Sequence, residues 1–212
     1  MTRKRKTMRK AQISRKTNEV DIQGEFAIDG QGKTKISTGF EPLNHLLTVF
    51  AFHGLFDLEL QAKGDLQHHI IEDIGIALGK ALKEALADKE GINRYGSFSL
   101  TMDKVVVESN IDISGRPALH REISALNDNN IRQAIAHSTF DDTTFTFGQA
   151  EEFLESFVQH AGISLVYNIK SGEGDLHHLL EALFKGMGKA LDQATQIDIR
   201  RQGIPSTKGV ID

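Results

Sequence analysis

The sequence contains no cysteine, and none of its apolar runs approaches the roughly 18 residues that a membrane-crossing helix needs. Without cysteine the chain forms no disulfide and offers no thiolate ligand, which is typical of a reducing compartment. The basic first residues are not followed by the apolar stretch of a secretory signal. We therefore expect a cytoplasmic protein without a membrane span, in which histidine and carboxylate groups would hold any metal.

Positive charge is concentrated at the amino terminus. Residues 1–16 contain eight Lys or Arg and no acid, although the formal net charge of the whole chain is −4. Such a run can bind nucleic acid, but no aromatic residues lie among these charges to stack on bases. We interpret residues 1–14 as a flexible basic arm and expect no nucleic-acid partner.

The most informative feature is an internal repeat. GDLQHHIIEDIGIALGKAL begins at Gly64, and GDLHHLLEALFKGMGKAL begins at Gly174. In each copy two adjacent histidines precede a glutamate, and Gly-Lys-Ala-Leu begins 11 residues after the first histidine. Self-similarity at this length indicates a structural duplication. We predict two half-repeats, residues 15–92 and 93–200, followed by a tail over residues 201–212.

Each half is predicted to run strand, strand, helix, strand, helix. In the first half, the alternating residues 19–28 and the turn at 29–32 predict a hairpin with the strand that follows. In the second half, we expect strands within 97–115, a polar loop at 127–130 and a helix near 149–160. A long helix then carries each copy of the repeat.

The repeated His-His-x-x-Glu sequences are candidate metal sites. Residues three or four apart share a helix face, whereas adjacent residues point about 100° apart, so the histidines of one pair suit different metal ions. Aligning the halves on His53 and His160 places His45 and Glu152 at the same position and adds one candidate to each half. Seen alone, Glu152 would be assigned to a solvated helix face. The candidate metal ligands are His45, His68, His69, Glu72, Glu152, His177, His178 and Glu181.

Imidazole with carboxylate suits manganese, iron or zinc. Other polar segments are typical of an anion site, because arginine forks and a Ser/Lys loop with free amides bind phosphate. Each of them alone would be an ordinary turn or surface charge. These segments are residues 93–96, residues 114–117, Lys185 and residues 206–209.

With the two clusters, Arg-Tyr-Gly, Ser-Gly-Arg-Pro, Phe-Lys and Pro-Ser-Thr-Lys-Gly in this order, the chain resembles the imidazoleglycerol-phosphate dehydratases of histidine biosynthesis from about Arg15 to Gly209. The resemblance implies an α+β fold of two similar half-domains, like domain 2 of ribosomal protein S5. Each half would be a four-stranded sheet with helices on one face, the helices of both halves lying between the sheets. It also implies homo-oligomers, trimers that assemble into a 24-mer, with active sites between subunits.

The activity implied by the resemblance is dehydration of imidazole glycerol phosphate to imidazole acetol phosphate, with two Mn²⁺ per active site. The histidines and glutamates of both repeats, and His45, match the family's metal motifs. In the same way, Glu19 matches its proton shuttle and Asp103 an aspartate near the reacting carbons. The residues that match its phosphate site are Arg94, Arg116, Lys185, Ser206 and Lys208.

The chain departs from the family pattern at several of these places. Glu152 stands where the family has a histidine ligand, and Lys104 and Val166 replace a glutamate and a histidine. A second hypothesis therefore stays open, a divergent metal-binding assembly of the same fold that is non-catalytic or has altered specificity.

Overall fold

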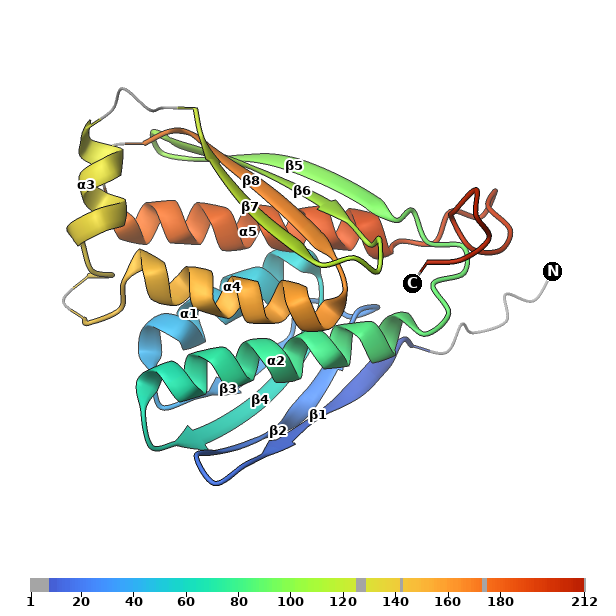
Figure 1. The fold of residues 1–212 in the computed structure, drawn as a ribbon, viewed down its shortest axis with the longest axis horizontal. Helices are drawn as coiled ribbons and strands as arrows, with labels where there is room; N and C mark the ends of the chain where they lie inside the picture. Colours follow the sequence, from blue (N-terminus) through green and yellow to red (C-terminus); the bar gives the residue numbers. More distant parts are fainter. Residues whose placement is uncertain (1–7, 125–128, 142, 173–174, 212) are drawn as a thin grey trace.

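Two four-stranded sheets enclose a layer of helices in the computed structural model, which describes residues 8–124, 129–141, 143–172 and 175–211 (Figure 1). The first half consists of β1 (Lys10–Lys16), β2 (Val20–Ala27), β3 (Thr34–Ser37), α1 (Glu41–Gly54), β4 (Asp57–Gly64) and α2 (Gln67–Leu86). The second consists of β5 (Tyr95–Met102), β6 (Val105–Asp112), β7 (Ala118–Ile123), α3 (Asn129–His137), α4 (Phe147–Ala161), β8 (Ser164–Ser171) and α5 (Leu176–Thr195). Among the described residues, no helix combines the length and apolarity of a membrane span.

The two sheets have the same topology. Their strand orders are β1-β2-β4-β3 and β5-β6-β8-β7. In each sheet the third strand of the half, β3 or β7, runs parallel to its neighbour β4 or β8, and the other pairs are antiparallel. The predicted α+β fold of two similar halves, with helices between the sheets, is confirmed.

The first hairpin differs from the prediction. β2 pairs with β1, whereas β3 pairs in parallel with β4, so the predicted β2–β3 hairpin is wrong. The prediction of a flexible arm is also wrong for residues 10–14, which lie in β1; residues 1–7 lie outside the described residues. β1 is ordered because Ala11 and Ile13 are buried between outward-facing polar residues, and because Arg15 pairs with Asp73 of α2 at 2.6 Å.

Helix α3 was not predicted. The polar loop was expected at residues 127–130, of which 127 and 128 lie outside the described residues, and α3 begins at Asn129. Its buried residues, Ile131 and Ala134, are three apart and form a narrow apolar stripe in an otherwise polar segment. That short stripe explains why composition alone indicated a loop.

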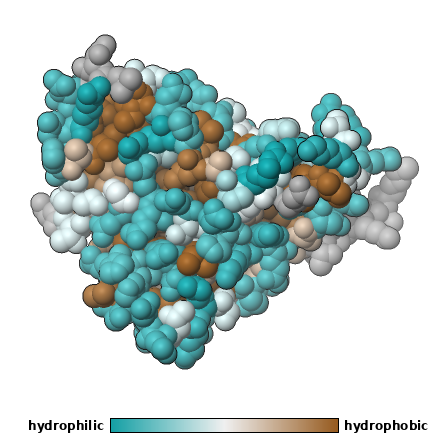
Figure 2. Space-filling model, viewed as in Figure 1, coloured by the Kyte–Doolittle hydropathy of each residue, from teal (hydrophilic) through white to brown (hydrophobic). Residues whose placement is uncertain are grey.

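Both halves contribute to one hydrophobic core. The ring of Phe50 from α1 packs against Phe157 from α4 at 6.1 Å, and Phe153 stacks on Phe184 of α5 at 5.7 Å. Figure 2 shows that the viewed surface is mainly hydrophilic, with hydrophobic atoms in separate patches. The helices of the two halves are therefore buried against each other, and neither half has a core of its own.

Glycines let helices from opposite halves approach closely. On α2, a Cβ at Gly75 would lie 2.7 Å from the carbonyl oxygen of Phe153 in α4, and one at Gly79 would lie 2.5 Å from that of Phe157. On α5, a Cβ at Gly188 would collide with the carbonyl oxygen of Phe50 in α1. The pairs α2/α4 and α1/α5 thus meet backbone against backbone.

We expect Gly188→Ala to lower the free energy of unfolding by about 1–3 kcal/mol, because a rigid backbone carbonyl occupies the space of the new methyl group. The matched control is Gly148→Ala in α4, where the nearest heavy atom lies 3.8 Å from the added Cβ. That change should raise stability by up to about 1 kcal/mol, since alanine restricts the unfolded chain. Urea unfolding at one fixed protein concentration measures both, and equal effects would contradict the close-approach argument.

Candidate metal centre

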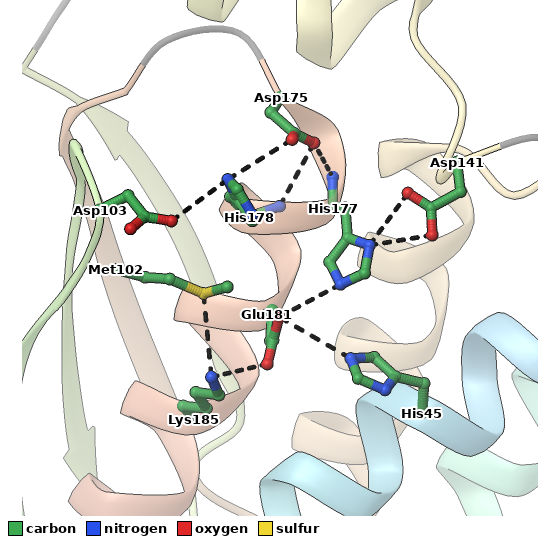
Figure 3. Close-up of polar contacts among 9 residues, drawn as sticks. All are labelled: His45, Met102, Asp103, Asp141, Asp175, His177, His178, Glu181 and Lys185. Carbon is green, nitrogen blue, oxygen red and sulfur yellow. Dashed lines mark hydrogen bonds and ion pairs between the residues drawn. The ribbon is translucent and has the colours of Figure 1, made fainter.

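The adjacent histidines contact different neighbours, although on α2 the rings of His68 and His69 also meet edge to face with centroids 4.2 Å apart. On α5, His177 faces α1 and Glu181, whereas His178 faces the turn between β5 and β6 (Figure 3). On α2, the ring of His69 contacts Asp65, and the charge of His68 instead acts on Glu152 of α4. Each pair therefore serves two different environments.

The α1/α5 cluster consists of His45, His177 and Glu181. Its ligand atoms lie within 4.8 Å of one another, and it is the one group of three or more metal-type ligands found among the described residues. Glu181 Oε2 is 3.2 Å from His177 Nε2 and 3.8 Å from His45 Nε2 (Figure 3). His177 and Glu181 share a face because they are four residues apart on α5.

The donor atoms of this cluster fit a divalent metal. Nε2 of His45 is buried and has no hydrogen-bond partner. Burial alone would raise the pKa of the Glu181 carboxyl, but the hydrogen bond and charge of Lys185, with His45 and His177, hold that pKa below its ordinary value. Lys185 binds Oε1 at 2.6 Å, which leaves Oε2 facing the imidazoles. Two imidazole nitrogens and an ionised carboxylate are ligands that Mn²⁺, Fe²⁺ or Zn²⁺ accepts.

The α2/α4 cluster consists of His68, Glu72 and Glu152. Burial raises the pKa of the Glu152 carboxyl, and the charge of Glu72 raises it further, whereas His68 lowers it. Glu152 is half-buried and Glu72 is exposed, and a cation between two carboxylates that repel each other would stabilise both. Glu152 thus belongs to this cluster and is not a purely solvated surface residue.

Each cluster joins the two halves of the chain. The sequence alignment added His45 to the first half and Glu152 to the second. In the structure, His45 lies against the repeat of the second half, and Glu152 lies near the repeat of the first. The cause is the helix pairing, because α1 packs on α5 and α2 packs on α4.

The two candidate catalytic acids lie in equivalent turns. Glu19, between β1 and β2, is 3.9 Å from Nδ1 of His69, and Asp103, between β5 and β6, is 3.8 Å from Nδ1 of His178. Both carboxylates are largely exposed, at 55% and 73%. His69 and His178 therefore each have a carboxylate from a turn between two strands beside them.

Asp65 and Asp175 also lie next to His69 and His178. The pKa of His69 is raised, first by its hydrogen bond to Asp65 at 2.7 Å. Asp175 caps α5 by accepting from the backbone N–H of His177 and lies 3.4 Å from Nδ1 of His178. Both aspartates are part of the repeated Gly-Asp-Leu, but only Asp175 is the N-cap of its helix, so a helix-capping rule could have identified Asp175 and not Asp65.

Most of the predicted phosphate site lies at the far end of α5. Arg94 pairs with Asp112 at 2.8 Å and donates to the carbonyl of Pro205 in the carboxyl-terminal tail at 3.0 Å. Ser206 and Lys208 follow Pro205 within three residues of the chain. The loop that contains Arg116 begins directly after β6. Its first residue, Ile113, donates its N–H to the backbone carbonyl of Arg94. Of the predicted phosphate residues outside the tail, Arg94 thus contacts the tail that carries Ser206 and Lys208, and the β6–β7 loop with Arg116 begins beside Arg94. Figure 1 shows the tail beyond the carboxyl-terminal end of α5.

Lys185 is not brought to that end, since it binds Glu181 of the α1/α5 cluster. From His177 to Thr195, α5 spans roughly 27 Å at 1.5 Å per residue. The α1/α5 cluster and the tail therefore lie at opposite ends of one long helix, and a small substrate cannot reach both within one chain.

Sequence reasoning missed the turn between α3 and α4. Asp141 lies 2.9 and 3.0 Å from Nδ1 of His177 through its two carboxylate oxygens. Phe140 stacks on the same imidazole, with ring centroids 4.3 Å apart. No repeat or spacing marks these residues, because they lie in a segment that the first half lacks.

The fold and the clusters together define a class, a duplicated α+β protein with imidazole and carboxylate ligands at its helix interfaces. The family model for imidazoleglycerol-phosphate dehydratase matches residues 38–191. The chain therefore belongs to the imidazoleglycerol-phosphate dehydratase family and is an enzyme of the carbon–oxygen lyase class.

Individual relatives agree with this assignment. The chain is similar to the imidazoleglycerol-phosphate dehydratase of Pelobacter propionicus, with 45% identity over 206 residues that cover 96% of this chain and 99% of the relative. The crystal structure of the Staphylococcus aureus enzyme superposes with a TM-score of 0.75 and 33% identity, covering 89% of this chain and 99% of that one. The Pyrococcus furiosus enzyme, solved in complex with (S)-C348, gives 0.74 and 34%, covering 92% and 98%.

We expect Glu152→Gln to stabilise the metal-free protein and to flatten its pH dependence. The pKa of Glu152 is raised in the folded state, so folding favours its protonated form. The free energy of unfolding should therefore fall as pH rises through the range where glutamate titrates, roughly pH 4 to 7. Urea unfolding in chelator measures this slope, and the variant should lose part of it.

The matched control is Glu155→Gln, an exposed acid on the same helix, which should leave the slope unchanged. With Mn²⁺ present, Glu152→Gln should instead be less stable than the wild type, because it removes a negatively charged ligand. Equal slopes for the wild type and the Glu152 variant would contradict the proximity of Glu152 to Glu72.

Proposed function

We propose that this protein dehydrates imidazole glycerol phosphate to imidazole acetol phosphate with two divalent metal ions, Mn²⁺ first among them, at each active site. The observation that carries the proposal is the α1/α5 cluster, with the unpartnered Nε2 of His45 facing Glu181. The α2/α4 cluster, with Glu152 near Glu72 and His68, supports a second metal position. Membership of the family supplies the reaction.

His45, His177 and Glu181 would hold one ion, and His68, Glu72 and Glu152 the other. His69 and His178, which lie beside Glu19 and Asp103, then remain for ions shared with neighbouring subunits. A divalent ion there would act as a Lewis acid toward the imidazole ring of the substrate and make it a better electron acceptor.

The chain's own acids move the protons. Glu19, largely exposed beside His69, is placed to take the carbon-bound proton. Asp103 occupies the equivalent turn beside His178, where it can assist departure of the hydroxyl group. Lys185 holds the outer oxygen of Glu181 and keeps this carboxylate ionised and oriented.

The phosphate group would be held by Arg116, Ser206 and Lys208 near Arg94. Because these residues lie at the opposite end of α5 from the α1/α5 cluster, we propose that a complete site combines the clusters of one subunit with the tail of another. Closed assembly of trimers into a 24-mer meets this requirement. Remote phosphate binding would then orient the reacting carbons.

The direct test is an assay of purified protein with imidazole glycerol phosphate and added Mn²⁺. We expect turnover that is lost in chelator, recovers with Mn²⁺ and is absent in His45→Ala. Glu152→His is the informative second variant, because it restores the residue that the family pattern has at this place. Metal binding without turnover, unchanged in Glu152→His, would instead favour the non-catalytic assembly.

Mixing inactive variants tests whether sites are shared between subunits. His45→Ala removes a cluster ligand and Lys208→Ala removes a tail cation, so each alone should have little activity. Co-assembled in equal amounts, they should regain up to about a quarter of the sites, those that pair two intact parts. No recovery from assemblies shown to contain both variants would contradict shared sites.

A further inference from the structure

Several hydrogen bonds join the described residues of the turn between α3 and α4. The N–H of Phe140 donates to the carbonyl of Phe145 at 2.7 Å, and the N–H of Thr143 donates back to the carbonyl of Phe140 at 3.1 Å. Thr139 and Thr146 form an isolated β-bridge across its base. Thr146 also caps α4 in a capping box with Gln149, so the turn is joined rigidly to that helix.

This turn presents two side chains to one imidazole. The carboxylate of Asp141 meets Nδ1 of His177 at 2.9 and 3.0 Å, and the ring of Phe140 lies on the imidazole face at 4.3 Å with 18° between the planes (Figure 3 for Asp141). Asp141 has a φ of 49°, a left-handed conformation that aspartate tolerates better than most residues. Phe140 is buried, whereas the Asp141 side chain is 58% exposed.

The hydrogen bond fixes the tautomer of His177. An ionised carboxylate only accepts hydrogen bonds, so Nδ1 must carry the proton. Nε2 is then the ring nitrogen that lies 3.2 Å from Glu181 Oε2, with a ligand atom of His45 within 4.8 Å of both. Because Oε2 only accepts, either a proton on Nε2 or a divalent cation between the three atoms satisfies this arrangement.

The first half of the chain has no counterpart to this turn. Only residues 38–40 separate β3 from α1, whereas residues 124–146 separate β7 from α4. The His177 ring is thus held by a segment that exists in one half only. This segment orients a ligand of the α1/α5 cluster and none of the α2/α4 cluster.

We propose that Asp141 is a positioning residue of the α1/α5 metal site. It holds the proton on Nδ1 of His177 and, with Phe140, fixes the ring plane toward Glu181 and His45. Carboxylates that orient a ligating histidine typically contribute 10–100-fold in metal affinity. The proposal rests on the proposed function, since it requires that this cluster binds a divalent metal.

The first test is calorimetric titration of the full-length, metal-free protein with Mn²⁺. Asp141→Ala should weaken one class of sites by about 10–100-fold and leave the other class unchanged. Asp141→Asn, which can still accept from Nδ1 but lacks the charge, should fall between the alanine variant and the wild type. The matched control is Thr144→Ala, an exposed change in the same turn that leaves Asp141 and Phe140 in place.

The second test reads the tautomer directly. In ¹⁵N-histidine-labelled, metal-free protein, the His177 imidazole should show a protonated Nδ1 in the wild type and in Asp141→Asn, and a shift toward protonated Nε2 in Asp141→Ala. A merely structural role for Asp141 would not move this signal. His177→Ala identifies the resonance.

The outcomes separate this inference from the proposed function. Failure of the wild type to bind Mn²⁺ would overturn the proposed metal-dependent function and this inference with it. Tight binding by the wild type with equal affinity in Asp141→Ala, or loss in both classes of sites together, would overturn the role of Asp141 alone. Selective weakening of one class, with the tautomer shift, supports it.

Discussion

The close contact of helices from opposite halves is the constraint on which the rest of the structure depends. Gly188 lets α5 meet the backbone of α1, and Gly75 and Gly79 let α2 meet α4. Only at this spacing does His45 come within reach of Glu181. The sheets cover the outer faces of the helix layer, and their turns supply the remaining acids. The duplication therefore brings candidate metal ligands together by pairing helices from opposite halves.

Electrostatics gives these helix interfaces their chemistry. Burying a carboxylate without a partner is costly, and a single buried cation offsets that cost. In the α1/α5 cluster, Lys185 neutralises one oxygen of Glu181 and leaves the other to a metal. In the α2/α4 cluster, burial raises the pKa of Glu152, and the charge of Glu72 raises it further. The two interfaces thus differ in charge although their helices correspond.

Much of the fold and of the ligand set could be predicted because the repeat is written in contiguous residues. The divergence of His177 from His178 followed from helical geometry, and the sheets followed from the family resemblance. The pairing of His45 with the other half could not be predicted from spacing, because it depends on which helices touch across 130 residues of chain. Strand β1 was hidden by its outward charges, although Ala11 and Ile13 alternate correctly.

The turn at Asp141 was invisible for a different reason. A carboxylate that orients a ligand needs no fixed distance in sequence from it, since the tertiary structure brings the two together. Asp141 is 36 residues from His177 and belongs to a segment that the first half lacks. Departures from the repeat therefore carry as much functional information as the repeat itself. The α1/α5 cluster has an added aspartate behind a histidine, and the α2/α4 cluster has Glu152 as a candidate ligand of its own. In the proposed function, the first negative charge would act on a metal through an imidazole and the second directly, so the two proposed ions should differ in Lewis acidity and in how easily they exchange.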